Sequence, residues 1–181
     1  MTSNYFFMAD SANPSGLTGT AFPAVAGYYG GPRAYRVWSH TEWASFKGLK
    51  LPIWVAGFDG HGEGEQAVAE LKRLGVPPHS QGDGTMTAVD METRRDRTYL
   101  QKFAAVLNAA GYRVWDYGSL STVFTDLKLD GYWVADYTDL NTAEAVLSQP
   151  GIRAVQFREG SVARDYDVSL VKDWVARFMW I

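Results

Sequence analysis

The sequence of 181 residues contains no cysteine, which excludes disulfide bonds, thiolate zinc sites and cysteine nucleophiles. It contains no basic run, and its net charge of −3 argues against a nucleic-acid binder or a polybasic membrane anchor. No apolar stretch approaches the roughly 20 residues that a membrane-spanning helix needs. The first residues lack the basic segment and long apolar core of a secretory signal, which predicts synthesis in the cytoplasm without a signal peptide.

Several catalytic motifs are also missing. There is no Gly-x-Ser-x-Gly motif, and the glycines of residues 57–64 lack the Lys-Ser/Thr pair of a phosphate-binding loop. The three histidines lie in loop or cap contexts, which argues against a Ser-His-Asp hydrolase. His61, Glu63 and Glu65 alternate in a glycine-rich stretch, but this is not a standard metal-ligand spacing. The pattern favours a solvated loop over residues 58–64.

Apolar runs rich in β-branched and aromatic residues recur along the whole chain. They predict strands at residues 4–9, 24–29, 51–57, 85–91, 112–117, 131–136 and 152–157, with a short eighth near 165–168. The runs are continuous rather than alternating, which is typical of strands that are buried on both faces.

Helical patterns fill the gaps between these strands. Apolar residues recur at helical spacing in residues 65–74, 95–110 and 168–179. Two pairs, Ser39 with Glu42 and Asn141 with Glu144, have the spacing of a helix N-cap and the acid that completes it.

This alternation predicts one α/β domain over residues 1–181 with a parallel sheet and right-handed crossovers. Seven or eight such units favour a small, irregular (β/α)8 barrel of the TIM type. The chain is shorter than the roughly 200–250 residues usual for that barrel, so some helices must be short or missing. An open, doubly wound sheet is the alternative architecture.

The sharpest chemical signal is the pair Asp90 and Glu92 at the end of the strand predicted for 85–91. A spacing of two residues places both side chains on one face of a strand, with Cα atoms roughly 6.6 Å apart. In such a pair one carboxyl, crowded by its neighbour or by apolar walls, has a raised pKa and can donate a proton. The alternative interpretation is a polar strand end with two solvated acids.

Other acids follow other strands. Asp10, Asp59, Asp136 and Asp167 all lie near predicted strand ends, which in a parallel barrel converge on one rim. Any one of them alone is more often a turn or cap residue, and only their shared position favours a site.

Aromatic side chains lie beside these acids, among them Tyr117, Trp133 and Tyr137. Acids and aromatic rings together are suited to sugars, since rings contact C–H faces and acids bind hydroxyls. The alternative is that most of these rings fill the core.

The order of these motifs resembles the family 25 glycoside hydrolases, which are muramidases acting on peptidoglycan, and the related uncharacterised glycoside-hydrolase-like barrels. The shared motifs, which span nearly the whole chain, are an acid ending the first strand (Asp10), the Asp-x-Glu of residues 90–92, the Tyr-rich stretch of 112–119, the Trp-x-Ala of 133–135, Gln156-Phe157 and Asp167-Val168.

This resemblance implies cleavage of the β-1,4 bond after N-acetylmuramic acid. Glu92 would be the general acid and then the base, Asp90 would orient the substrate or stabilise positive charge, and Asp10 would complete the catalytic set. The remaining residues expected to bind substrate are Asp167, Tyr117, Trp133, Asp136, Tyr137, Gln156 and Asp59. The resemblance implies no metal and no organic cofactor.

Three hypotheses follow for the whole protein. The first is an active muramidase whose partner is the bacterial cell-wall glycan, and which reaches the wall if it is phage-encoded or carried in a virion. The second is a non-catalytic barrel that binds glycans or serves as a structural component of a phage particle. The third is a glycosidase that acts on another glycan.

Overall fold

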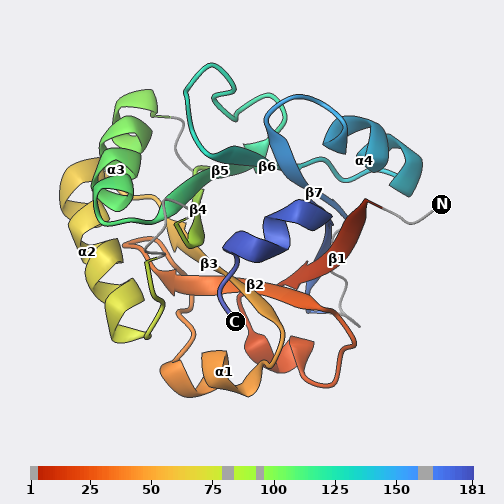
Figure 1. Cartoon of the computed structure of the whole chain (residues 1–181), viewed down its shortest axis with the longest axis horizontal. Helices are drawn as coiled ribbons and strands as arrows, with labels where there is room; N and C mark the ends of the chain where they lie inside the picture. The colour runs from red at the N-terminus through yellow and green to blue at the C-terminus, as the bar shows by residue number, and fades with distance from the viewer. Residues whose placement is uncertain (1–3, 79–83, 93–95, 159–164) are drawn as a thin grey trace.

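Eight strands close into a barrel in which each strand neighbours the next one along the chain (Figure 1). The strands are β1 (Tyr5–Asp10), β2 (Ala24–Gly30), β3 (Leu49–Val55), β4 (Met86–Asp90), β5 (Arg113–Ser119), β6 (Gly131–Ala135), β7 (Ile152–Arg158) and β8 (Asp167–Lys172). This computed structural model describes residues 4–78, 84–92, 96–158 and 165–181. The (β/α)8-type barrel expected from the sequence is confirmed, and the open sheet is excluded.

The last strand runs against the others. β1 to β7 pair in parallel, whereas β8 pairs antiparallel with both β7 and β1. The expectation of a wholly parallel sheet is therefore wrong, whereas the eighth strand expected near 165–168 is present and longer than expected, as Asp167–Lys172. Residues 159–166 are too few for the crossover of a dozen or more residues that a parallel neighbour requires.

Helices α1 (His40–Ser45), α2 (Gly60–Arg73), α3 (Arg97–Ala109) and α4 (Leu140–Leu147) lie outside the barrel (Figure 1). The structure also has two 3-10 helices, η1 (Pro14–Leu17) and η2 (Asp173–Phe178). No α-helix stands between β5 and β6 in the chain, which agrees with the expectation that some helices are missing. Among the described residues, no helix is both long and apolar enough to cross a membrane.

The helix expected over residues 168–179 is wrong, because β8 occupies its first half. Val171 points into the barrel while Leu170 packs outside it among residues of α4 and β7, and both are completely buried. A strand buried on both faces carries apolar residues at every position, and short apolar runs of this kind do not distinguish strand from helix.

Short side chains set where the helices begin. Ser39 and Glu42 form the expected capping box at α1, a contact of about 1 kcal/mol. α4 is instead capped by Asp139 rather than Asn141. Asp59 caps α2, so most of the segment expected as a solvated loop, residues 58–64, is the first turn of that helix.

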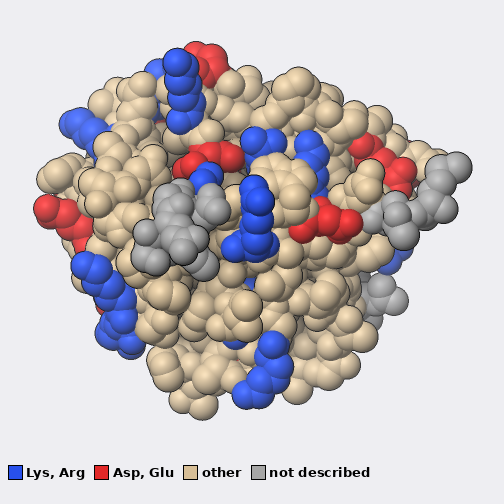
Figure 2. Space-filling view, in the orientation of Figure 1, with Lys and Arg blue, Asp and Glu red and all other residues tan. Residues whose placement is uncertain are grey.

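One end of the barrel is closed by η2, which lies over its centre in Figure 1. Val175, Phe178 and the following Met179 pack into the same cluster as the apolar side chains of the barrel interior. Lys and Arg side chains gather over the middle of this face (Figure 2). The guanidinium groups of Arg113 and Arg177 lie 4.5 and 4.6 Å from the centroid of the Phe178 ring in η2.

Candidate active site

The other end of the barrel is polar. Inward-facing residues occur at every second position of a strand, and near η2 they are apolar, as with Met8, Ala88 and Trp115. Two residues further along the same strands stand Asp10, Asp90 and Tyr117. Period-two alternation along parallel strands therefore carries these polar groups to one end of the barrel, where the strands terminate.

Gln156 of β7 is completely buried, and its side chain hydrogen-bonds several polar residues at this end of the barrel. Its amide nitrogen donates to Asp10 Oδ1 at 3.2 Å and to Asp167 Oδ2 at 2.8 Å. Its amide oxygen accepts from the Tyr117 hydroxyl at 2.6 Å and from the Tyr137 hydroxyl at 3.4 Å. One side chain thus connects residues of β1, β5 and β8 with the segment that follows β6.

Asp167 reaches the site from an antiparallel strand, which the sequence did not predict. The sequence indicated a residue following the seventh strand, but Asp167 is the first residue of β8 and pairs in register with Asp10. Because β8 is antiparallel, its beginning lies where the parallel strands end. The reversed strand thereby places a second acid directly beside Asp10.

Glu92 lies beyond the end of β4, in a turn, so the expected placement of Asp90 and Glu92 on one strand face is wrong. The Glu92 backbone N–H donates to Asp90 Oδ1 at 3.0 Å, which is a side-chain-to-backbone turn. Glu92 still faces the same site, since its carboxyl lies near enough to Tyr117 and Asp167 for both to shift its pKa.

The acids perturb one another. Burial, the charge of Asp167 and the charges of Glu92 and Asp90 raise the pKa of Asp10 well above its usual value, although the Gln156 hydrogen bond opposes this. Burial raises the pKa of Asp90 to about 6, helped by the charge of Glu92. Partial desolvation and the charge of Asp167 raise the pKa of Glu92, against a lowering hydrogen bond from Tyr117. The sequence predicted one raised and one low pKa, whereas all three rise in the free protein.

Tyr28 of β2 belongs to the site and was missed by the sequence reasoning. It lies near enough to Asp90 to lower the pKa of that carboxyl, and burial together with the charge of Asp90 raises the pKa of Tyr28 above its usual range. The signal was available, because Ala24, Ala26 and Tyr28 alternate along β2 as Met8 and Asp10 do along β1.

Trp133 was expected to line the site, but it is completely buried beneath it. Its indole N–H donates to Ser169 Oγ at 3.0 Å, and its ring centroid lies 4.5 Å from that of Tyr117. Trp133 therefore supports Tyr117 from below and does not form an accessible wall.

The other predicted residues lie around the rim. Tyr137 is 53% exposed, and burial raises the pKa of its hydroxyl to about 12. Asp136 follows β6, and its backbone N–H donates to the carbonyl oxygen of Gln156 at 2.9 Å. Asp59 follows β3, but its carboxylate is occupied as the cap of α2, where it accepts from the His61 N–H at 3.1 Å.

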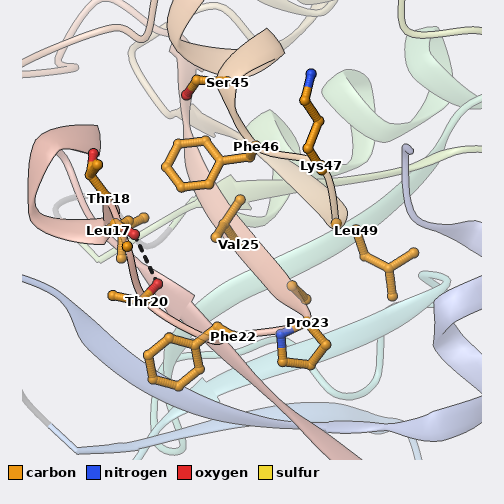
Figure 3. A pocket seen from close by; sticks show the side chains of 13 residues that line it. Leu17, Thr18, Thr20, Phe22, Pro23, Val25, Ser45, Phe46, Lys47 and Leu49 are labelled. Carbon is orange, nitrogen blue, oxygen red and sulfur yellow. Dashed lines mark hydrogen bonds between the residues drawn. The ribbon is translucent and has the colours of Figure 1, made fainter.

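A separate cavity of about 350 Å³ lies among the beginnings of β2 and β3, at the end opposite the carboxylates. Phe22, Val25 and Phe46 are among the side chains that line it, and the Thr20 hydroxyl near its edge donates to the carbonyl oxygen of Leu17 (Figure 3). No acid lines it among the described residues, so it takes no part in the carboxylate site.

No family model and no curated protein matches this sequence. Solved structures do share the fold. An uncharacterized protein of B. stearothermophilus matches with a TM-score of 0.76 at 16% identity, covering 97% of this chain and 100% of that one.

Two further structures come from Streptococcus pneumoniae. The modular autolysin LytC matches with a TM-score of 0.67 at 15% identity, and the match covers 94% of this chain but only 47% of LytC. LytC is also known in complex with a synthetic peptidoglycan ligand. GHIP, a glycosyl hydrolase 25 that participates in host cell invasion, matches with a TM-score of 0.58 at 13% identity over 93% of this chain and 88% of GHIP.

At identities of 13 to 16% these matches establish a shared barrel fold. They include a glycosyl hydrolase and an autolysin, as the resemblance in the sequence implied. None of them bears on an association with a phage particle.

Proposed function

We propose that this protein is a glycoside hydrolase of the bacterial cell wall that cleaves the β-1,4 bond after N-acetylmuramic acid. The observation that carries the proposal is the convergence of Asp10, Asp90, Glu92 and Asp167 at one end of the barrel, joined by Gln156 and two tyrosines. The shared fold of an autolysin and a glycosyl hydrolase 25 supports it.

In this proposal Glu92 donates a proton to the leaving oxygen and later withdraws one from water. It is the most exposed of the four acids, and it lies near enough to Tyr117 and Asp167 for both to shift its pKa. Asp90 faces the same space and carries the negative charge that stabilises an oxocarbenium-like transition state, directly or through the substrate's acetamido group. Asp10 and Asp167 bind at the floor, and Tyr137 at the rim.

The protons of this site belong to a coupled set. Asp10, Asp90 and Glu92 all have raised pKa values, so the free protein retains protons among them to a higher pH than separate, solvated carboxyls would. A bound sugar would redistribute these protons, because its oxygens accept hydrogen bonds from protonated carboxyls and its hydroxyl groups donate hydrogen bonds to the ionised carboxylates. The acid–base pair that hydrolysis requires is then formed in the complex.

A second candidate function is glycan binding without catalysis. It is favoured by the same raised pKa values, because none of the three carboxyls has, in the free protein, the low pKa expected of a charge-stabilising partner. Association with a phage particle stays a prediction under either function.

The decisive experiment is hydrolysis of purified bacterial cell walls, followed by loss of turbidity and by analysis of the reducing ends released. We expect Glu92→Gln to fold normally and to lose hydrolysis, because a positioned proton donor contributes roughly 10²–10⁴ to the rate. The matched control is Glu65→Gln, an exposed carboxyl on α2, which should retain activity.

Unchanged activity in folded Glu92→Gln would remove Glu92 from the mechanism. Wild-type protein that binds walls but releases no reducing ends would establish the second candidate instead.

A further inference from the structure

Glu63, in the first turns of α2, is a buried carboxylate surrounded by hydrogen-bond donors. It is only 7% exposed. Its Oε1 accepts from the backbone N–H groups of Phe58 at 2.7 Å and Asp59 at 3.2 Å. Its Oε2 accepts from the Gly57 N–H at 2.9 Å, and also from the Tyr99 hydroxyl at 2.6 Å and the Trp54 indole at 3.3 Å. Both oxygens are thus occupied by donors from β3, α3 and the intervening segment 57–59.

These donors keep Glu63 ionised. Burial alone would raise the pKa of Glu63, but the hydrogen bonds from Tyr99, Phe58, Asp59 and Trp54 outweigh it and lower the pKa below its usual value. A permanent anion that accepts from three consecutive backbone N–H groups fixes the path of that segment. The expectation that Glu63 lies in a solvated loop is therefore wrong.

The segment that Glu63 holds begins beside the candidate active site. Val55 of β3 pairs with Asp90, and the next residue, Ala56, donates its N–H to the carbonyl oxygen of Asp90 at 3.0 Å. Gly57 then passes so close to Glu63 that an added Cβ would lie 2.3 Å from its carboxylate oxygen. The chain therefore has little freedom between the strand end at Asp90 and the Glu63 carboxylate.

This path presents Phe58 at the rim. The Phe58 side chain is 70% exposed, although its backbone N–H is held by Glu63. The guanidinium group of Arg33, from the segment after β2, lies 4.7 Å from the centroid of the Phe58 ring. An exposed ring on a firmly held segment that follows the strand end at Asp90 is suited to the C–H face of a pyranose sugar.

We propose that Glu63 is a positioning residue that fixes residues 57–59 so that Phe58 forms a sugar-binding wall of the site. This inference rests on the proposed function, since it assigns the wall to the glycan. Glu63 touches no substrate and acts through Phe58.

The positioning is tested by amide hydrogen exchange on the full chain. Glu63→Gln replaces one acceptor oxygen by an NH₂ group that opposes the backbone donors, so exchange at residues 57–59 should become at least tenfold faster. Tyr99→Phe removes one donor, keeps the carboxylate and should give a smaller change in the same direction, which covers the case that Glu63→Gln fails to fold. Glu65→Gln, an exposed acid on the same helix, should leave exchange unchanged. Unaltered exchange at 57–59 in both Glu63→Gln and Tyr99→Phe would overturn the positioning role.

The ligand role is tested by a cycle of Phe58→Ala, Glu63→Gln and the double variant on purified peptidoglycan. Each single variant should raise KM several-fold with a smaller change in kcat, and the double variant should be no worse than Phe58→Ala alone. Additive effects on KM, or a Phe58→Ala variant with unchanged KM, would overturn the proposal, because a merely structural Glu63 lowers stability without coupling to Phe58.

Failure of the proposed function is distinguished by the wild type. Wild-type protein that neither sediments with insoluble peptidoglycan nor hydrolyses it overturns the proposed function and the sugar-binding wall together. The exchange measurement still decides whether Glu63 holds residues 57–59.

Discussion

At the scale of single residues, the ionised form of Asp90 that hydrolysis requires lowers the stability of the folded protein. Burial raises its pKa from 3.8 to about 6. Because the folded-state pKa is the higher one, this contribution to stability is fully present below about pH 4 and is lost as the pH rises through 6. A difference of about two pKa units corresponds to about 3 kcal/mol at most. The protein therefore keeps a carboxylate at this position at the expense of stability near neutral pH.

We expect Asp90→Asn to abolish hydrolysis while raising the free energy of unfolding by about 1–3 kcal/mol at pH 7.5. The gain should vanish at pH 4, where the native carboxyl is protonated. Urea unfolding at the two pH values measures both effects. Asp173→Asn, which changes an exposed carboxyl at the closed end, is the control. An equal gain at both pH values would show that the effect does not come from ionisation.

Gln156 stabilises the folded protein, because its amide nitrogen donates hydrogen bonds to Asp10 and Asp167, which would otherwise repel each other. Its hydrogen bond lowers the pKa of Asp10, whereas burial and Asp167 raise it. We expect Gln156→Leu to lower the free energy of unfolding by about 2–4 kcal/mol at pH 7.5, since it leaves buried polar groups unpaired. The loss should be smaller at pH 4.5, where protonated carboxyls no longer repel. Thermal unfolding at both pH values tests this, and a loss independent of pH would contradict it.

At the scale of elements, the short helix η2 closes the barrel in place of a longer helix. Phe178 is 2% exposed and packs with Val175 and Met179 among the interior side chains. We expect Phe178→Ala to reduce the free energy of unfolding by about 3–5 kcal/mol, as for other large-to-small core changes. Trp174→Ala, at a residue of the same helix that is 44% exposed, should cost clearly less in the same denaturant titration. Similar losses for both variants would mean that η2 packs less firmly than its burial indicates.

The elements also show what the sequence could and could not predict. Seven strands were found close to their observed positions, because buried parallel strands are continuous apolar runs with clear boundaries. The eighth strand was predicted too short, near 165–168, and most of β8 was included in a helix over 168–179, since its two buried faces leave no alternation to indicate a strand. Its antiparallel direction depends on which strands it joins. Asp10 and Asp90 followed from their strand ends, whereas Tyr28 and the hydrogen-bonding role of Gln156 depend on contacts across the barrel that no local pattern records.

At the scale of the whole molecule, the two ends of the barrel differ in charge. The charged groups that face one another at the open end are acids, whereas the end closed by η2 carries Lys and Arg side chains with acids among them (Figure 2). Mutual repulsion at the open end makes its proton content a property of the set rather than of one residue.

We expect the rate of cell-wall hydrolysis to follow a bell-shaped pH profile with its maximum in mildly acidic solution. The alkaline limb should reflect loss of the proton that Glu92 must donate, since the pKa of Glu92 is raised. The acidic limb should reflect protonation of Asp90, whose pKa is raised to about 6 and whose negative charge the mechanism requires. Initial rates between pH 4 and 9 at constant ionic strength measure this profile. A rate that climbs steadily into alkaline solution would contradict the carboxylate mechanism and direct attention to a base such as His61.

The antiparallel pairing of β1 with β8 also sets the order of events during synthesis. Tyr5 to Asp10 of β1 pair with Lys172 to Asp167 of β8. All of the residues between these two strands must therefore be synthesised before β1 finds its second neighbour, and until then β1 and β7 present unpaired edges. Joining ends so distant in sequence carries a large loop-closure entropy, which slows folding. Barrel closure is accordingly the step at which nascent chains are most exposed to aggregation, and the step that a chaperone would assist.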